Sequence, residues 1–269
     1  MGATAPRERR AARTPPATET GPAHPRSARI APCAPPRRLP APTPEPPPPR
    51  HPLPAILLAL CSALLLTLVG IEWRPLLDLD TGIARTTHRW AVEEPTLTQA
   101  SRILTDWIWD PWTMRILCGA TALLLFRRYA DGWTALWLLL TVAVGTAVQQ
   151  GLKAALNRAR PTWPDPVDSA HYAAFPSGHA MTATVVCGLL LWLLRRHGAP
   201  RVLWRTALTV AAVSVIGVGL TRIWLGVHWP TDVLGGWLLG ALLVLAAVEF
   251  HNRRGPATVH LGRSPRRPR

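Results

Sequence analysis

The chain has 269 residues, of which 48% are hydrophobic, and a formal net charge of +15 at pH 7. Such a charge would suit a nucleic-acid-binding protein, but many of the basic residues lie in the two ends of the chain and the middle is apolar. Positive charge beside apolar spans is typical of membrane topology, so we expect a membrane protein with no nucleic-acid partner.

The first fifty residues contain 15 prolines, nine arginines and few large apolar side chains. A segment of this composition cannot bury enough surface to offset its ordering entropy. We therefore predict a disordered Pro/Arg-rich tail over residues 1–51 and a second disordered basic tail over residues 252–269. Neither tail indicates a protein partner.

Apolar runs between the tails predict an all-α membrane domain over residues 52–251. The first run, residues 53–71, is 19 uncharged residues long, enough to cross a hydrocarbon core of about 30 Å. Residues 72–111 are more polar, and a stripe at helical spacing predicts an amphipathic helix at the membrane surface: Leu97, Ile103, Leu104, Trp107 and Ile108. Further spans are expected at 112–126, which is short and contains Arg115, and at 133–152, 178–194, 203–220 and 233–250. The domain is thus a bundle of about six transmembrane helices.

An even number of spans places both tails on one side of the membrane. With the tails in the cytoplasm, 21 of the 30 Lys and Arg residues are cytoplasmic, as the positive-inside rule requires. These include the pair Arg127–Arg128 and the loop from Arg195 to Arg205. Three polar clusters, each at the end of a span, then all fall on the non-cytoplasmic face.

The first cluster runs from Lys153 to Pro161 and contains Arg158 and Arg160. Lys153 is the only lysine in the chain, which indicates a need for a compact ammonium, although a cation anchoring the membrane edge would look the same. Lys153 and Arg160 are seven residues apart, two helical turns, so both can face one ligand. The planar fork of Arg suits phosphate oxygens.

The second cluster is Phe175-Pro176-Ser177-Gly178-His179, which opens the fourth span. Ser177 is placed as the N-cap of that helix, Gly178 permits close approach, and the free N–H groups of the first turn form an anion site. A bound anion would favour the protonated form of His179, the form that a general acid needs. A plain cap and a polar interfacial residue are the simpler interpretations of Ser177 and His179.

The third cluster holds Arg222, His228 and Asp232. The four-residue separation lets the carboxylate of Asp232 reach one imidazole nitrogen of His228 and leave the other free to act as a base, metal ligand or nucleophile. Together with Lys153 and Arg160, Arg222 supplies three positive charges for a phosphoryl group. Such charges beside hydrocarbon are costly when unpaired, which favours a functional explanation.

Together the strings Lys153-x6-Arg160-Pro161, Pro176-Ser177-Gly178-His179 and Arg222-x5-His228-x3-Asp232 resemble the type 2 phosphatidic acid phosphatase (PAP2) superfamily, which shares its site with vanadium haloperoxidases. The resemblance covers about residues 55–250. Thr221 stands where the family usually has Ser, and threonine keeps the hydroxyl.

The resemblance implies a helical core like that of the superfamily and a role for each motif residue. His228 would be the nucleophile that forms a phosphohistidine, Asp232 would hold its ring, and His179 would protonate the departing oxygen and then assist water. The phosphate oxygens would be held by Lys153, Arg160, Ser177, Gly178 and Arg222. No metal and no other cofactor is needed, because cationic side chains take the place of Mg²⁺.

The sequence therefore predicts a membrane phosphatase that hydrolyses a lipid phosphate or pyrophosphate in the bilayer, at the non-cytoplasmic face. Phosphatidic acid, phosphatidylglycerol phosphate and undecaprenyl pyrophosphate all remain open. A serine hydrolase built on Ser177 is less favoured, because the Gly-x-Ser-x-Gly pattern is absent. A membrane transporter or lipid-binding protein is the main alternative, and it would be expected to carry its charges in mid-span.

Overall fold

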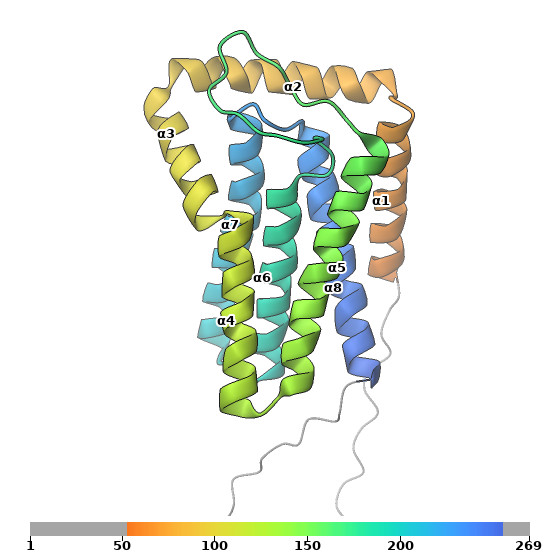
Figure 1. Cartoon of the computed structure of the whole chain (residues 1–269), viewed down its shortest axis with the longest axis vertical. Coiled ribbons are helices and arrows are strands. Elements are labelled where there is room, and N and C mark those ends of the chain that lie inside the picture. Colours follow the sequence, from red (N-terminus) through yellow and green to blue (C-terminus); the bar gives the residue numbers. More distant parts are fainter. Residues whose placement is uncertain (1–52, 255–269) are drawn as a thin grey trace, which may run out of the picture. The chain divides into compact units, whose positions relative to one another are not determined.

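The fold was obtained as a computed structural model that describes residues 53–254. Helices are the regular secondary structure of these residues, which contain no strand, so the predicted all-α class is confirmed (Figure 1). In chain order the elements are α1 (Leu53–Gly70), α2 (Arg74–Glu93), α3 (Pro95–Ile103), the π-helical turn η1 (Leu104–Ile108), α4 (Pro111–Tyr129), α5 (Gly132–Leu156), α6 (Gly178–Arg196), α7 (Arg201–Trp224) and α8 (Pro230–Arg254). The predicted tail 1–51 lies outside the described residues, as does 255–269 of the second.

The helix ends follow local chemistry. The Asp110 side chain accepts a hydrogen bond from the Trp112 N–H at 2.8 Å and begins α4, and the Asp131 side chain does the same for Thr134 at the start of α5, at 3.0 Å. At the other end of α5, Asn157 adopts a left-handed conformation with φ of 39° and stops the helix.

Within residues 53–254, five helices are long and apolar enough to cross a membrane: α1, α5, α6, α7 and α8. The predicted second span corresponds to α4, which carries three arginines, Arg115, Arg127 and Arg128, and is not among the five. In Figure 1, α3 descends beside the bundle and leads into α4, which runs along the bundle and has the same length as α6, 19 residues. A sixth crossing therefore stays a prediction.

The segment before α4 differs from its prediction in extent. Residues 74–93 form a helix that the sequence analysis did not foresee, α2, which lies across the end of the bundle where α8 begins (Figure 1). The predicted amphipathic stripe falls on α3 and η1, where Leu97, Ile103 and Trp107 are exposed and Leu104 packs against the core. Together α2 and α3 cover one end and one flank of the bundle.

The core lies around α6, which packs against α4, α5, α7 and α8. The contact with α8 is unusually close: a Cβ at Gly236 would lie 2.8 Å from the Ser177 carbonyl oxygen and 3.0 Å from the Met181 nitrogen. Only a residue without a side chain fits between these backbones. This approach brings the beginnings of α6 and α8 together.

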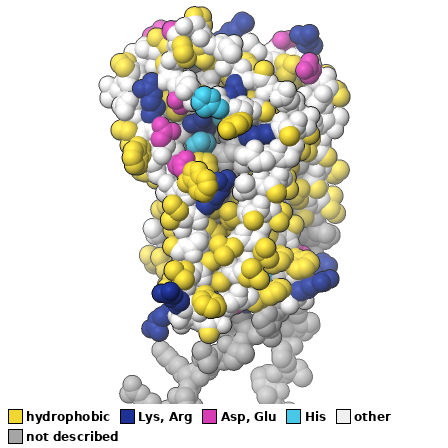
Figure 2. Space-filling model, in the orientation of Figure 1, with side chains coloured by type: hydrophobic (Ala, Val, Ile, Leu, Met, Phe, Trp, Pro, Cys, Tyr) yellow, Lys and Arg dark blue, Asp and Glu magenta, His cyan; other side chains and the backbone are white. Residues whose placement is uncertain are grey.

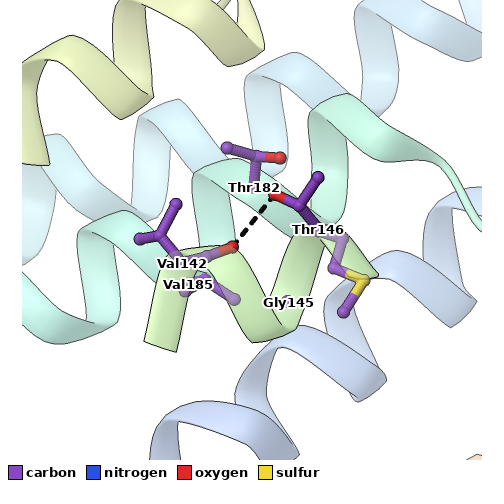
Figure 3. A pocket seen from close by; sticks show the side chains of 6 residues that line it. Val142, Gly145, Thr146, Thr182 and Val185 are labelled. Carbon is purple, nitrogen blue, oxygen red and sulfur yellow. Dashed lines mark hydrogen bonds between the residues drawn. The ribbon is translucent and has the colours of Figure 1, made fainter. Parts of the chain in front are cut away.

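Between α5 and α6 the interior is almost filled. The small space in Figure 3, lined by Val142, Gly145, Thr146, Met181, Thr182 and Val185, has a volume of only about 10 Å³, at the limit of one water molecule. The hydroxyl of Thr146 donates to the Val142 carbonyl at 3.0 Å, within its own helix. This part of the helix pair offers no room for a ligand.

Candidate active site

The three predicted clusters meet at the end of the bundle that α2 covers. They stand where α5 ends, α6 begins, α7 ends and α8 begins, and these four helix ends lie together in Figure 1. Backbone hydrogen bonds join them: the Ser177 N–H donates to the Asp232 carbonyl at 2.9 Å, and the Ala174 N–H donates to the Arg158 carbonyl at 2.8 Å. In Figure 2, charged and histidine side chains gather near this end, above a largely apolar surface.

His228 and Asp232 form the predicted pair. His228 Nδ1 lies 3.3 Å from Asp232 Oδ2, and both side chains are buried. The same carboxylate oxygen accepts the Trp229 N–H at 2.8 Å, which fixes its position at the start of α8. The imidazole is therefore held on its Nδ1 side.

The other ring nitrogen of His228 faces a cation. Arg160 Nη1 lies 3.1 Å from His228 Nε2, and a guanidinium can only donate hydrogen bonds. Nε2 must therefore carry the lone pair, and the ring proton sits on Nδ1, directed at Asp232. This is the tautomer that a nucleophilic Nε2 requires.

The pKa of His228 lies well below its ordinary value of 6.5. Burial is the main cause, followed by the positive charges of Arg160, Arg222 and Lys153. Arg160 contacts the imidazole directly, and Arg222 and Lys153 lie near enough for their charges to act on it. The ring is consequently neutral, with its lone pair available, at neutral pH.

Lys153 and Arg222 are both buried cations, 8% and 5% exposed. Lys153 Nζ donates to the Ala173 carbonyl, and Arg222 Nη1 lies 3.8 Å from Asp168 Oδ2. Two buried polar atoms in this region have no hydrogen-bond partner: Arg222 Nε and Ser177 Oγ. Because such atoms are costly to leave unpaired, they indicate a site built for a polar ligand.

Ser177 is the N-cap residue of α6, as predicted, but its side chain makes no cap hydrogen bond. A plain capping role therefore does not account for it. Nor does its hydroxyl pair with His228, as a serine nucleophile would. At Gly178, the space left by the absent side chain is taken by the Gln149 amide, whose nitrogen lies 2.5 Å from where a Cβ would stand.

His179 lies in the first turn of α6 and is half-buried. The charges of Arg222 and Arg160 act on its ring, so it belongs to the same end of the bundle. Within residues 53–254 no hydrogen bond to its ring is formed, which leaves both nitrogens open to a ligand.

Arg160 is more constrained than the sequence suggested. Besides His228 it donates to the backbone carbonyls of Tyr172 at 2.8 Å, His171 at 3.1 Å and Val227 at 2.5 Å. Burial lowers the pKa of its guanidinium. For a phosphorus atom to reach His228 Nε2, the contact from Arg160 Nη1 has to give way.

Several residues join the site that the sequence did not single out as ligands or catalysts. Asp168 faces Arg222, and Arg158 bridges Asp232 to Asp80 of α2. Arg158 was visible as the neighbour of Arg160, but nothing local pointed to Asp80. Thr221, which stands where the family usually has Ser, has its hydroxyl 2.6 Å from that of Thr105. In the described part of the chain, no group of three His, Cys, Asp or Glu side chains could hold a metal ion.

Comparisons with known proteins point to one family. The PAP2 superfamily model matches residues 134–256. Phosphatidylglycerophosphatase B of Bacillus subtilis is 33% identical over 127 residues, which are 46% of this chain and 62% of that protein, less than two thirds of its length. Decaprenylphosphoryl-5-phosphoribose phosphatase of Mycolicibacterium smegmatis is 31% identical over 142 residues, 45% of this chain and 71% of that protein.

A solved structure has the same fold. The crystal structure of a transmembrane PAP2 type phosphatidylglycerolphosphate phosphatase from Bacillus subtilis superimposes with a TM-score of 0.64 and 26% sequence identity. The match covers 74% of this chain and 96% of that one.

Proposed function

The chain belongs to the PAP2 superfamily, and we propose that it is an integral membrane phosphatase that hydrolyses a lipid phosphate or pyrophosphate through a phosphohistidine on His228. Its relatives are named as phosphatases, and five helices in the described part of the chain are long and apolar enough to span a bilayer.

One observation carries the proposal: a neutral histidine whose Nε2 lone pair faces Arg160 lies in a buried, strongly cationic end of the bundle. Arg160 marks the lone pair on Nε2, and Asp232 holds the opposite nitrogen. Close by, Ser177 Oγ and Arg222 Nε are buried polar atoms without partners. A tetrahedral anion would satisfy both atoms and offset the positive charge.

In the first step the Nε2 lone pair attacks phosphorus and forms a P–N bond. The P–O bond to the lipid or to the leaving phosphate breaks, and its electron pair stays on the departing oxygen, which takes a proton from His179. The His228 ring gains positive charge, which the Asp232 carboxylate stabilises across Nδ1. Lys153, Arg160, Arg222, Ser177 and the Gly178 N–H hold the oxygens of the transferring group.

In the second step water replaces the histidine. His179, now neutral, takes a proton from the water as its oxygen bonds to phosphorus, and the P–N bond breaks to return its electrons to Nε2. Inorganic phosphate leaves and both histidines regain their starting states. The phosphate dianion brings the negative charge that favours a protonated His179 at the start of the next cycle.

The position of the site supports a lipid substrate. It lies at the ends of α5, α6, α7 and α8, beside apolar surface that faces the bilayer, so a lipid tail can stay in the membrane while its phosphate enters. By the arginine asymmetry this end is on the non-cytoplasmic side and both tails are cytoplasmic. Labelling a cysteine placed at Ser169 but not one at His197, from outside intact cells, is the expected result; the reverse pattern contradicts this orientation.

Phosphate release from a panel of pure lipids tests the function. We expect turnover of phosphatidic acid, phosphatidylglycerol phosphate or undecaprenyl pyrophosphate to persist in excess EDTA and to stop with vanadate, which imitates five-coordinate phosphorus. Lipid phosphate binding without release of phosphate would favour the transporter or lipid-binding alternative. Activity lost in EDTA and restored by Mg²⁺ would contradict the mechanism.

A further inference from the structure

We propose that Asp80 and Arg158 are positioning residues that act on His228 through Asp232, so that the helix covering the site, α2, belongs to the catalytic arrangement. The inference deepens the proposed function and rests on it. It concerns two residues outside the three motifs, one of them more than 140 positions from the histidine that it influences.

Arg158 connects two carboxylates. Its Nη1 donates to Asp232 Oδ1 at 2.6 Å and its Nη2 donates to Asp80 Oδ2 at 2.7 Å. The three side chains are nearly free of solvent, at 12% exposure for Arg158, 2% for Asp80 and 0% for Asp232. Each Asp232 oxygen therefore has an assigned partner: Oδ1 takes Arg158, and Oδ2 takes His228 and the Trp229 N–H.

Asp80 also fixes the start of α8 directly. Its Oδ1 accepts the Thr231 N–H at 2.9 Å, and its Oδ2 accepts the Thr231 hydroxyl. Arg158 Nη1 reaches that hydroxyl as well, at 2.7 Å. The residue next to Asp232 is thus tied to α2, and a displacement of α2 would move the carboxylate that orients His228.

The charges give Asp80 a second role. Arg158 alone would neutralise Asp232 and weaken its hold on the imidazolium that forms when Nε2 attacks. With Asp80 on the other side of the guanidinium, the two carboxylates and one guanidinium keep one net negative charge behind Nδ1. Arg160 stands at the opposite ring nitrogen, and the positive charges of Arg222 and Lys153 also act on the ring. This polarity favours electron density on Nε2 and stabilises the phosphohistidine.

A buried ion pair can also exist for folding alone, so the test has to separate the two roles. Asp80→Asn keeps the shape and an acceptor oxygen but removes the charge. Arg158→Gln removes the guanidinium, and the double variant removes both. The matched control is Asp78→Asn, the same change on an exposed residue of α2. All proteins are studied as full chains in detergent or nanodiscs, with the folded fraction measured.

We expect Asp80→Asn to lower kcat on an aryl phosphate by about 10–100-fold, the range found for residues that support metal ligands from behind, with KM little changed. In the Arg158→Gln background the same substitution should cost less than about threefold, because the charge of Asp80 acts through Arg158 and the Asn side chain keeps an acceptor oxygen for the Thr231 N–H. Equal losses in both backgrounds, or a loss as large in Asp78→Asn, would overturn the inference.

The acid limb of kcat/KM distinguishes charge from loosened packing. His228 faces Asp232 of α8, Lys153 of α5, His179 of α6, Arg222 of α7 and Arg160 of the loop. Removing the Asp80 charge disfavours the protonated ring, so the limb should stay in place or move to lower pH. A site opened to water would instead move the limb up toward 6.5, and that result would overturn the inference.

Direct vanadate binding repeats the comparison without turnover. Vanadate affinity should fall in Asp80→Asn by a factor similar to that in kcat and should be spared in the Asp78→Asn control. If the wild-type chain binds vanadate but hydrolyses no phosphate ester, the proposed function fails. The vanadate affinities of the single and double variants then still decide the roles of Asp80 and Arg158. Unchanged vanadate affinity in Asp80→Asn would contradict the positioning role.

Discussion

The two ends of the helix bundle use the same residue types in different ways. At the end opposite the site, Arg127, Arg128 and Arg253 are exposed. At the site end, Arg158 and Arg222 are largely buried under α2 and the loop before α6. An exposed arginine is solvated and serves topology, whereas a buried one needs a counter-charge or a ligand.

Two buried histidines sharpen the contrast. His251, at the far end, has its Nε2 3.1 Å from the Thr134 hydroxyl and its ring 4.8 Å from that of Trp192. His228 lies between a carboxylate and a guanidinium. Both are about equally buried, so burial does not make a histidine reactive; its partners do.

The largest expected effect on activity separates the two buried histidines, His228 and His251. His228→Ala should lower turnover of an aryl phosphate by at least about 10⁴-fold, because a nucleophile is lost. His251→Ala removes a buried ring and should lower the unfolding temperature, yet the protein that remains folded should keep its kcat within about threefold. Similar losses of kcat in the two variants would remove the distinction between the ends.

The arginines offer a smaller effect. Arg222→Gln removes a buried cation from the site and should lower kcat by about 10²–10³-fold, as the loss of one transition-state donor does. Arg195→Gln makes the same change at an exposed position of the opposite end and should leave kcat unchanged. Steady-state kinetics on both variants checks this, and a comparable loss in Arg195→Gln would argue against a site confined to one end.

The smallest effect concerns pH. Because burial and the nearby cations hold the pKa of His228 below its ordinary 6.5, the acid limb of kcat/KM should lie below pH 6.5. Arg160→Gln removes one of those cations, so the limb should move to higher pH. Measuring both proteins on one substrate cancels the ionisation of the substrate. If the acid limb of Arg160→Gln moves to lower pH, or does not move, the nearby cations are not the cause of the lowered pKa of His228.

The lowered pKa of His228 also makes the free energy of unfolding depend on pH. The unfolded chain binds a proton at His228 near pH 6.5, and the folded chain does so only at lower pH. The stability from this group is thus fully present above pH 6.5 and is lost as the pH falls toward the folded pKa. The unfolding temperature should fall in mild acid, and less so for His228→Gln.

Much of this architecture could be predicted from local sequence. The apolar runs located α1 and α4 to α8, although α8 begins before and ends after its apolar run, because backbone hydrogen bonding continues into the polar flanks. The pairing of His228 with Asp232 followed from their spacing, and the meeting of the three clusters from the parity of the spans.

Other features could not be predicted, because they depend on distant contacts. Asp80 reads as one acid among others on a polar helix, and only the packing of α2 over the bundle brings it to Arg158. Asp168 likewise meets Arg222 only through the path of a loop without regular structure. The contact between Arg160 Nη1 and His228 Nε2 could not be predicted either, so the structure was needed to show which ring nitrogen carries the lone pair.

Rapid-quench labelling with an aryl [³²P]phosphate in excess EDTA tests the central claim most directly. The wild-type chain should form an acid-labile phosphoenzyme mapped to the peptide containing His228, and His228→Ala should form none. His179→Ala should still form it and accumulate it, because the aryl group leaves without a proton while the second step lacks its base. A label on His179 or Ser177, or an acid-labile phosphoenzyme formed by His228→Ala but not by His179→Ala, would contradict the account.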